Sequence, residues 1–148
     1  MYNKILVPLD GSKRAEKILP HVEALAMENG SKVIFLQAVR PPDVIDYDDM
    51  EMVLYQEEKR EQLRNAKSYL LALKGEFREK TINAETCIIS GLVVKEIIDC
   101  AERENVDLIA MTSHGRTGLA RAFYGSVAAG VLHIVDRPLL IIRSRSDY

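Results

Sequence analysis

The sequence predicts an α/β fold: a single doubly wound, five-stranded parallel sheet with helices on both faces. Five short apolar runs, at residues 5–9, 33–39, 86–89, 108–111 and 139–142, alternate with segments of helical periodicity. Four of these runs are nearly continuous in apolar residues, which is typical of parallel strands buried on both faces. Such alternation favours right-handed crossovers that place helices on both sides of one sheet. No linker or internal repeat divides the 148 residues, so we expect one domain over 1–148.

The first helix is predicted for residues 15–27, where apolar residues recur at helical spacing after the first strand. Ser12 is placed to cap this helix, and Gly30 is placed to end it. Pro20 removes one backbone hydrogen bond from this pattern, so the helix should kink or restart near Leu19.

The second strand leads into residues 40–49, where Pro41-Pro42 and four aspartates predict an exposed, mobile loop. Residues 50–79 are rich in Glu, Lys, Arg, Leu and Ala, and they predict one long helix. The third strand, at residues 86–89, has the weakest pattern and alternates, so we place it toward an edge of the sheet.

The remaining elements continue the alternation. Gly91 precedes a helix with one apolar face, formed by Val94, Ile97, Ile98 and Ala101. A last helix follows Gly125, and the inward residues predicted for it are Val127, Val131 and Leu132. Pro138 opens the final strand, which runs from Leu139 to Ile142. This strand is too apolar to be left as an exposed sheet edge, so we expect a homodimer.

Composition and charge exclude several classes of function. Apolar residues make up 47% and charged residues 28% of the chain, as in a globular protein. The formal charge of −2 offers no basic surface for nucleic acid. No apolar run approaches the ~20 residues that would cross a membrane. Cys87 and Cys100 lie 13 residues apart, outside any Cys-x-x-Cys pair or Cys/His cluster. We interpret them as small buried side chains of a cytoplasmic protein.

Two strand ends carry the residues that suggest a ligand site. Open parallel sheets bind ligands beyond the carboxyl ends of their strands, at the point where the strand order reverses. The first strand ends at Pro8, Leu9 and Asp10, and the fourth ends at Met111. If the sheet order is 3-2-1-4-5, these two ends flank the reversal.

The segment after the fourth strand has the chemistry that a phosphate group requires. Gly115 and Gly118 allow backbone N–H groups to approach an anion, and Arg116 and Arg121 add positive charge. Gly125-Ser126 then begins a helix whose first N–H groups are unpaired. The same glycines would equally serve as simple turns, and spacing alone does not decide between the two roles. Neither a P-loop nor a G-x-G-x-x-G motif is present.

Two other interpretations of these strand ends lack the residues that they need. Asp10 could be the phosphoacceptor of a receiver domain, but the paired acids and the further aspartate that such a domain needs are missing. Ser113 and His114 suggest catalysis. Adjacent residues, however, seldom present their side chains to each other, and neither an orienting acid nor a nucleophile elbow accompanies them.

Five stretches, at residues 4–12, 106–111, 113–119, 125–128 and 137–142, together match one family pattern. On these residues the chain resembles the universal stress protein family from end to end. The resemblance implies a Rossmann-like, adenine nucleotide alpha hydrolase-like fold with the strand order 3-2-1-4-5. It also implies a dimer in which the final strands of two chains meet.

The resemblance further implies an ATP site. In ATP-binding members a loop reads Gly-x-x-Gly, then nine residues, then Gly-Ser or Gly-Thr. Here Gly115 matches the second glycine and Gly125-Ser126 the final pair. Carried over by position, the other residues around the nucleotide would be Pro8, Asp10, Ala38, Met111, Gly118 and Val127. Asp10 would lie near the ribose or adenine, and Val127 would offer its N–H to the phosphates. Whether Mg²⁺ or Mn²⁺ accompanies the phosphates is left open.

Thr112 departs from the family pattern, since it stands at the position of the first glycine. Its β-branched side chain either narrows the pocket or points away and leaves binding intact. We therefore predict a nucleotide-binding stress or signalling protein that changes its state or partner when ATP is bound. The alternative is a dimeric interaction module that binds no nucleotide. No residue is an obvious base for water, so any ATP hydrolysis should be far slower than the ~10 s⁻¹ typical of enzymes.

Overall fold

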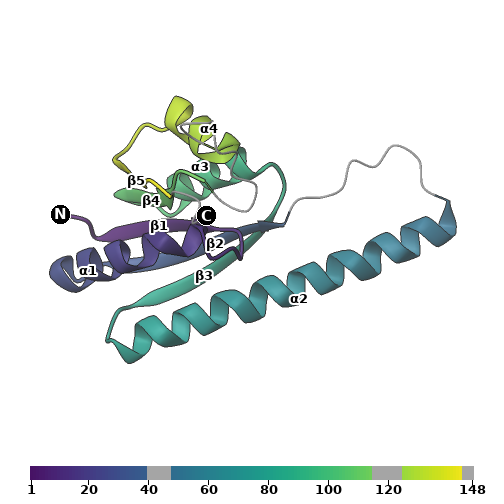
Figure 1. Cartoon of the computed structure of the whole chain (residues 1–148), viewed down its shortest axis with the longest axis horizontal. Helices are drawn as coiled ribbons and strands as arrows, with labels where there is room; N and C mark the ends of the chain where they lie inside the picture. The colour runs from purple at the N-terminus through teal and green to yellow at the C-terminus, as the bar shows by residue number, and fades with distance from the viewer. Residues whose placement is uncertain (40–47, 115–124, 145–148) are drawn as a thin grey trace.

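A five-stranded parallel sheet forms the centre of the molecule. The computed structural model describes residues 1–39, 48–114 and 125–144. The strand order is β3-β2-β1-β4-β5, which confirms the predicted topology (Figure 1). The strands are β1 (Lys4–Leu9), β2 (Lys32–Val39), β3 (Ala84–Ser90), β4 (Leu108–Thr112) and β5 (Leu139–Ile142). β3 lies at one edge, as its weak pattern predicted, and β5 at the other.

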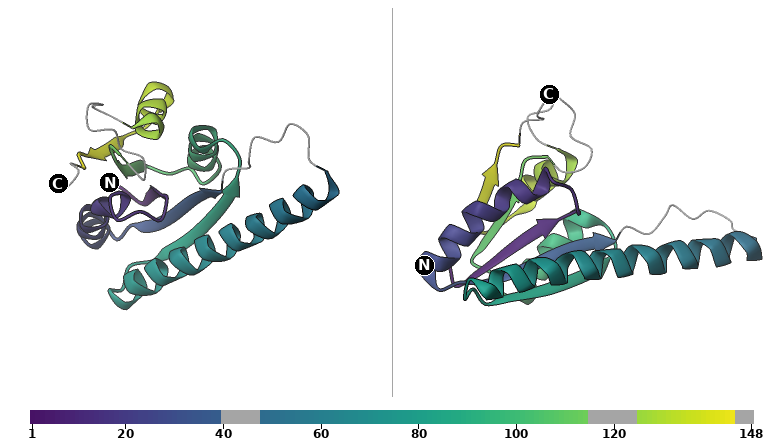
Figure 2. Two further views of the ribbon diagram at one scale, coloured as in Figure 1. Left: turned by 45° about the vertical axis from the view of Figure 1, so that its right-hand side comes forward. Right: turned by 60° about the horizontal axis from the view of Figure 1, so that its bottom comes forward.

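Helices cover both faces of this sheet. α1 (Leu19–Asn29) and α2 (Asp49–Glu79) pack on one face, and α3 (Val93–Arg103) and α4 (Ser126–Ile134) pack on the other (Figures 1 and 2). The period-two alternation of a strand explains both layers. Ile5 and Val7 of β1 pack toward α1 and α2, whereas Leu6 packs toward α3 and α4. All three side chains are fully buried.

The chain enters α1 through a short 3-10 turn, η1 (Ala15–Ile18). This turn leads α1 onto the face of the sheet that it shares with α2. The Ser12 hydroxyl oxygen accepts a hydrogen bond from the N–H of Ala15 at 3.1 Å, so Ser12 caps this turn. α1 then begins at Leu19, as predicted, with Pro20 in its first turn. A proline is tolerated there because its missing N–H would have no acceptor inside the helix. Gly30 ends the helix, also as predicted.

α2 is a long helix that only partly covers the sheet. It begins at Asp49, one residue before the prediction, because the Asp48 carboxylate accepts a hydrogen bond from the N–H of Glu51 at 2.8 Å. All its buried residues lie in its second half: Ala66, Leu70, Leu73 and Phe77. The first half extends beyond the sheet (Figures 1 and 2). Residues 40–47 of the predicted loop lie outside the described residues.

α4 corrects one predicted core position. Ala128 and Val131 are buried, but Leu132 is 47% exposed. Successive residues of an α-helix are rotated by about 100°, so Leu132 lies at the edge of the stripe centred near Val131. Within residues 1–39, 48–114 and 125–144, no helix is long and apolar enough to cross a membrane.

Candidate functional site

The strand order reverses between β1 and β4, and the candidate site lies there. From β1 the chain leads to α1 on one face of the sheet, and α4, the helix that follows β4 in the sequence, packs on the other face. Adjacent strands whose following helices pack on opposite faces leave a crevice beyond their carboxyl ends. The two predicted strand ends therefore flank this position, as the sheet order required.

At the end of β1, local hydrogen bonds orient Asp10. Its Oδ1 atom accepts a hydrogen bond from the N–H of Ser12 at 2.9 Å. The chain then turns away into η1, so the carboxylate stays at the carboxyl edge of the sheet. Pro8 is buried within β1, in register with Leu36 of β2.

At the end of β4, Thr112 bonds to its own loop. The side chain is 5% exposed, and its hydroxyl donates a hydrogen bond to the carbonyl oxygen of His114 at 2.8 Å. The hydroxyl group of Thr112, the residue that departs from the family pattern, is thus hydrogen-bonded to the backbone of the segment that follows β4. Its effect on ligand binding stays a prediction.

Gly125 brings the N-terminus of α4 against the end of β4. Its N–H donates a hydrogen bond to the carbonyl oxygen of Ser113 at 2.6 Å. A Cβ atom on residue 125 would lie 3.1 Å from that same oxygen, so glycine allows this approach without a shift of the neighbouring backbone. Gly125 supplies no side-chain cap to α4. Helix geometry therefore leaves the N–H groups of Ser126 and Val127 without acceptors inside the helix.

The other predicted site residues lie at different depths. Ala38, near the end of β2, is partly buried and pairs in register with Ile89. Met111 is 6% exposed and belongs to the core between the sheet and α3 and α4, so it has a packing role whether or not a base lies near it. Gly115 and Gly118 lie outside the described residues, as do Arg116 and Arg121.

The expectation that Ser113 and His114 do not present their side chains to each other is wrong. Ser113 Oγ lies 3.1 Å from His114 Nδ1, with a hydrogen bond whose donor depends on the tautomer. The N–H of Ser144, just after β5, also donates to Ser113 Oγ at 3.1 Å and holds the serine in place. His114 Nε2 is buried and has no hydrogen-bond partner in the part of the chain that the structure describes. The two contacts of Ser113 Oγ link the end of β4 to the chain just after β5.

A second group of side chains was missed in the sequence. Cys87 of β3 packs against the buried cluster that contains Cys100 of α3, and Arg103 Nη2 lies 4.0 Å from Cys87 Sγ. Cys100 is buried as expected, but Cys87 is only partly buried. Their positions in the sequence could have suggested this proximity, because one lies on a strand and the other on the helix that directly follows it and packs back on the sheet.

A sequence model of the universal stress protein family matches residues 1–143. The chain belongs to this family. Among its curated relatives, the universal stress protein MJ0577 of Methanocaldococcus jannaschii is 31% identical over an alignment of 159 positions, gaps included. The alignment covers 99% of this chain and 98% of the relative. The universal stress protein YxiE of Bacillus subtilis is 32% identical over 148 residues, which cover 97% of this chain and 100% of the relative.

Solved structures of universal stress proteins have the same fold. The structure of MJ0577 matches with a TM-score of 0.90 at 31% identity and covers 99% of both chains. A universal stress protein of Archaeoglobus fulgidus in complex with dAMP matches with a TM-score of 0.62 at 19% identity, over 95% of this chain and 98% of that one. A universal stress protein in complex with cAMP matches with a TM-score of 0.61 at 18% identity, over 97% and 98%. At these lower identities the likeness concerns the fold alone.

Proposed function

We propose that this universal stress protein binds ATP in the crevice between the ends of β1 and β4, and that binding changes its state or partner in a stress or signalling response. The observation that carries the proposal is the close approach of Gly125 to Ser113, with an N···O distance of 2.6 Å. It places the start of α4 at the point of the sheet where ligands of this fold class bind.

The start of α4 suits the phosphates. The N–H groups of Ser126 and Val127 are available to an anion, and the helix dipole adds roughly half a positive charge. The Ser126 side chain is exposed, so its hydroxyl can donate a further hydrogen bond. Gly115 and Gly118 would add backbone donors from the preceding loop.

The end of β1 suits the nucleoside. Asp10 is held at the edge of the crevice by the Ser12 N–H, and a carboxylate there would accept hydrogen bonds from ribose hydroxyls. Ala38 and Met111 would contact the adenine. The dAMP and cAMP complexes of two other family members support the choice of an adenine nucleotide. Among the described residues, no group of three His, Cys, Asp or Glu side chains is placed to hold a metal ion. Mg²⁺ or Mn²⁺ would therefore be held chiefly by the phosphates themselves.

Isothermal titration of nucleotide-free protein with ATP, with and without Mg²⁺, tests the proposal. We expect a Kd tighter than about 1 mM, which corresponds to about −4 kcal/mol. Asp10→Asn keeps an oxygen for the Ser12 N–H but removes the charge, so it should weaken binding about 10-fold. Asp99→Asn on the exposed side of α3 is the matched control and should leave the Kd unchanged. A wild-type Kd weaker than about 1 mM would contradict the proposal.

The second candidate is an interaction module that binds no nucleotide. Thr112 favours it, because this buried side chain occupies a position where ATP-binding relatives would carry glycine. The exposed apolar residues in the first half of α2 also suit a partner: Met50, Met52, Val53 and Leu54. Thr112→Gly and Thr112→Ser separate the two candidates, since serine keeps the hydroxyl and loses only the methyl group. If the ATP proposal is right, the wild type binds ATP. If only these variants bind ATP, the wild-type protein is the interaction module that binds no nucleotide.

We further propose a cytoplasmic homodimer joined through β5. Leu139 and Ile141 pack on the side of α3 and α4, while Leu140 and Ile142 pack on the other side. All four residues of this edge strand stay partly exposed, which leaves an apolar edge for a second copy.

A further inference from the structure

Cys87 and Cys100 lie together on the α3 face of the sheet, away from the crevice. Alternation along β3 sends Cys87 and Ile89 toward α3, whereas Ile88 packs on the face of α1 and α2. Cys100 is fully buried in the same cluster that Cys87 packs against. Cys87 belongs to an edge strand and is partly exposed, so of the two cysteines it is the one that a reagent in solution meets first.

Arg103 completes this group. It follows Cys100 by three residues on α3, so both side chains project from neighbouring positions of one helix face. Its Nη2 atom lies 4.0 Å from Cys87 Sγ and donates a hydrogen bond to it. Cys87 therefore lies beside a permanently charged guanidinium, on the side of the sheet that Cys100 and the rest of α3 cover.

These neighbours make the two thiols unlike each other. The neighbouring Cys100 thiol is the main effect that lowers the pKa of Cys87 to about 6, and the positive charge of Arg103 adds to it, against the effects of burial and of Glu104. The neighbouring Cys87 and burial raise the pKa of Cys100. Of the two thiols, Cys87 is therefore the one that ionises more readily. A low-pKa, accessible thiolate beside a second cysteine is the arrangement found in redox-sensing cysteines.

We propose that Cys87 and Cys100 form a peroxide-reactive thiol pair, in which Cys87 reacts first and Cys100 closes a reversible disulfide between β3 and α3. This site is independent of the proposed ATP site, because none of its residues borders the crevice.

The reaction balances with hydrogen peroxide as the oxidant. The Cys87 thiolate attacks one peroxide oxygen and the O–O bond breaks. The leaving hydroxide takes a proton from solvent and becomes water, and Cys87 becomes a sulfenic acid, oxidised by two electrons. Cys100 then attacks the Cys87 sulfur, the S–O bond breaks, and the departing hydroxide takes up the Cys100 proton as a second water. The two sulfurs are left joined, and a dithiol reductant restores both thiols.

Peroxide treatment of the whole protein, followed by peptide mapping, tests this inference. We expect hydrogen peroxide to remove two hydrogen atoms from the wild type and to yield one linked peptide that contains both cysteines. Reduction with dithiothreitol should restore the original mass. Unmodified cysteines, a sulfinate on Cys87 or a disulfide between two chains would each overturn the proposal.

Two single variants assign the order of the steps. In Cys87→Ser, the buried Cys100 should stay reduced under the same treatment. In Cys100→Ser, which keeps a hydroxyl donor for Cys87, oxidation should stop at a sulfenic acid that dimedone captures. Capture on Cys100 in the first variant, or absence of capture on Cys87 in the second, would overturn the assignment. Circular dichroism of each variant confirms that the fold is kept.

Alkylation by iodoacetamide checks the thiolate at Cys87 without any oxidant. The rate should rise through about pH 6 and level off near neutrality, since the thiolate is the nucleophile. Arg103→Gln should move this midpoint upward, whereas Arg103→Lys, which keeps the charge, should move it less. Glu104→Gln should move it downward, because the carboxylate opposes the thiolate. A wild-type midpoint at the ordinary value of about 8.5 would overturn the proposal.

Discussion

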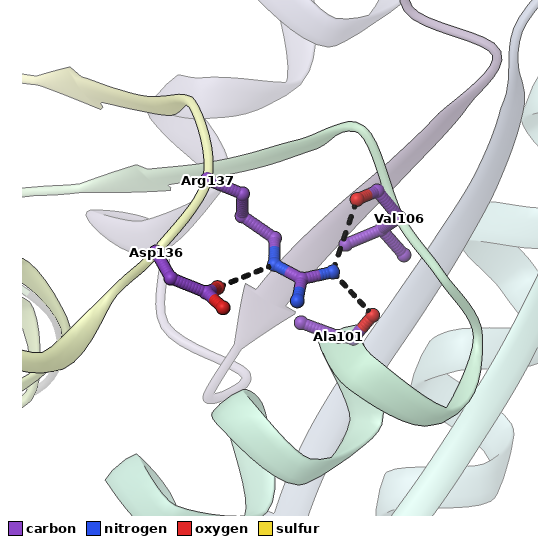
Figure 3. Close-up of polar contacts among 4 residues, drawn as sticks. All are labelled: Ala101, Val106, Asp136 and Arg137. Carbon is purple, nitrogen blue, oxygen red and sulfur yellow. Dashed lines mark hydrogen bonds and ion pairs between the residues drawn. The ribbon is translucent and has the colours of Figure 1, made fainter.

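Among single residues, Arg137 joins the start of β5 to the end of α3 and to the connection that follows α3. Its Nη1 atom donates to the carbonyl oxygens of Ala101 at 2.7 Å and Val106 at 3.2 Å, and Nε pairs with Asp136 at 3.0 Å (Figure 3). Ala101 lies in the last turn of α3, where carbonyl groups lack donors inside the helix and a positive charge is favourable. The Arg137 side chain is only 16% exposed. It therefore fixes the start of β5 against the connection from α3 to β4.

Replacing Arg137 should cost stability through these two carbonyl groups. We expect Arg137→Gln to lower the free energy of unfolding by about 2 kcal/mol, because two hydrogen bonds from a charged donor to partly buried carbonyl groups are lost. Arg137→Lys should cost less. Asp136→Asn is the control, since that carboxylate is 67% exposed and such pairs contribute below about 1 kcal/mol. Urea unfolding followed by circular dichroism measures all three, and equal losses in the Arg137→Gln and Asp136→Asn variants would contradict this account.

The sequence suggests candidate residues but not their contacts. Asp10 and Gly125 are candidates because a carboxylate after a strand and a glycine before a helix are each informative by type and position. The contact between Ser113 and His114 was not predictable, because it depends on how the backbone turns after β4. The proximity of Cys87 and Cys100 was missed because their separation in sequence does not say whether the Cys87 side chain points to the face of the sheet that α3 covers.

Among the elements, the close packing of α3 and α4 sets the position of the candidate site. A Cβ atom on Gly130 of α4 would lie 2.7 Å from Cγ2 and 3.3 Å from Cγ1 of Val94 on α3. Val94 is short and β-branched, so it has little freedom to move away. The absence of a side chain at residue 130 therefore allows α4 to lie against α3 and keeps its first residue beside β4.

Gly130→Ala should destabilise the protein by about 1 kcal/mol, because the packing cost exceeds the gain in helix propensity of about 1 kcal/mol. Gly75→Ala is the matched control on α2, where a Cβ would meet nothing within 4 Å. That variant should be stabilised by about 0.5–1 kcal/mol. Adding Val94→Ala should recover part of the loss in Gly130→Ala, and a double-mutant cycle of unfolding free energies measures this coupling. Additive effects would show that the two residues do not determine the contact.

For the whole molecule, the class of fold was predictable because continuous apolar runs distinguish buried parallel strands from helices. The strand order required the family resemblance, since alternation of strands and helices fits several orders. The extent to which α2 passes beyond the sheet was not predictable. Its charged, leucine-containing pattern continues unchanged from the exposed first half into the half that packs through Leu70 and Phe77.

The edge strand β5 carries the prediction of the homodimer. The N–H of Ser113 bonds to the carbonyl oxygen of Ile142, and the N–H of Ile109 bonds to that of Pro138. The backbone N–H and C=O groups of the even-numbered residues of β5 therefore point toward β4. By the period-two geometry of a strand, the N–H of Ile141 points to the open edge. Ile141→Pro therefore removes an edge donor and keeps the ladder to β4, while Ile141→Ala loses a similar side chain and keeps the donor.

We expect the wild type and Ile141→Ala to be dimers at micromolar concentration and Ile141→Pro to be a folded monomer. Sedimentation velocity measures the mass, and circular dichroism confirms that the monomer is folded. A monomeric wild type would contradict the dimer itself, because its apolar edge would then be left open to solvent. A dimeric Ile141→Pro variant would instead place the interface elsewhere on the surface. In that case, packing on the two faces of the sheet within one chain would explain why the β5 side chains are apolar.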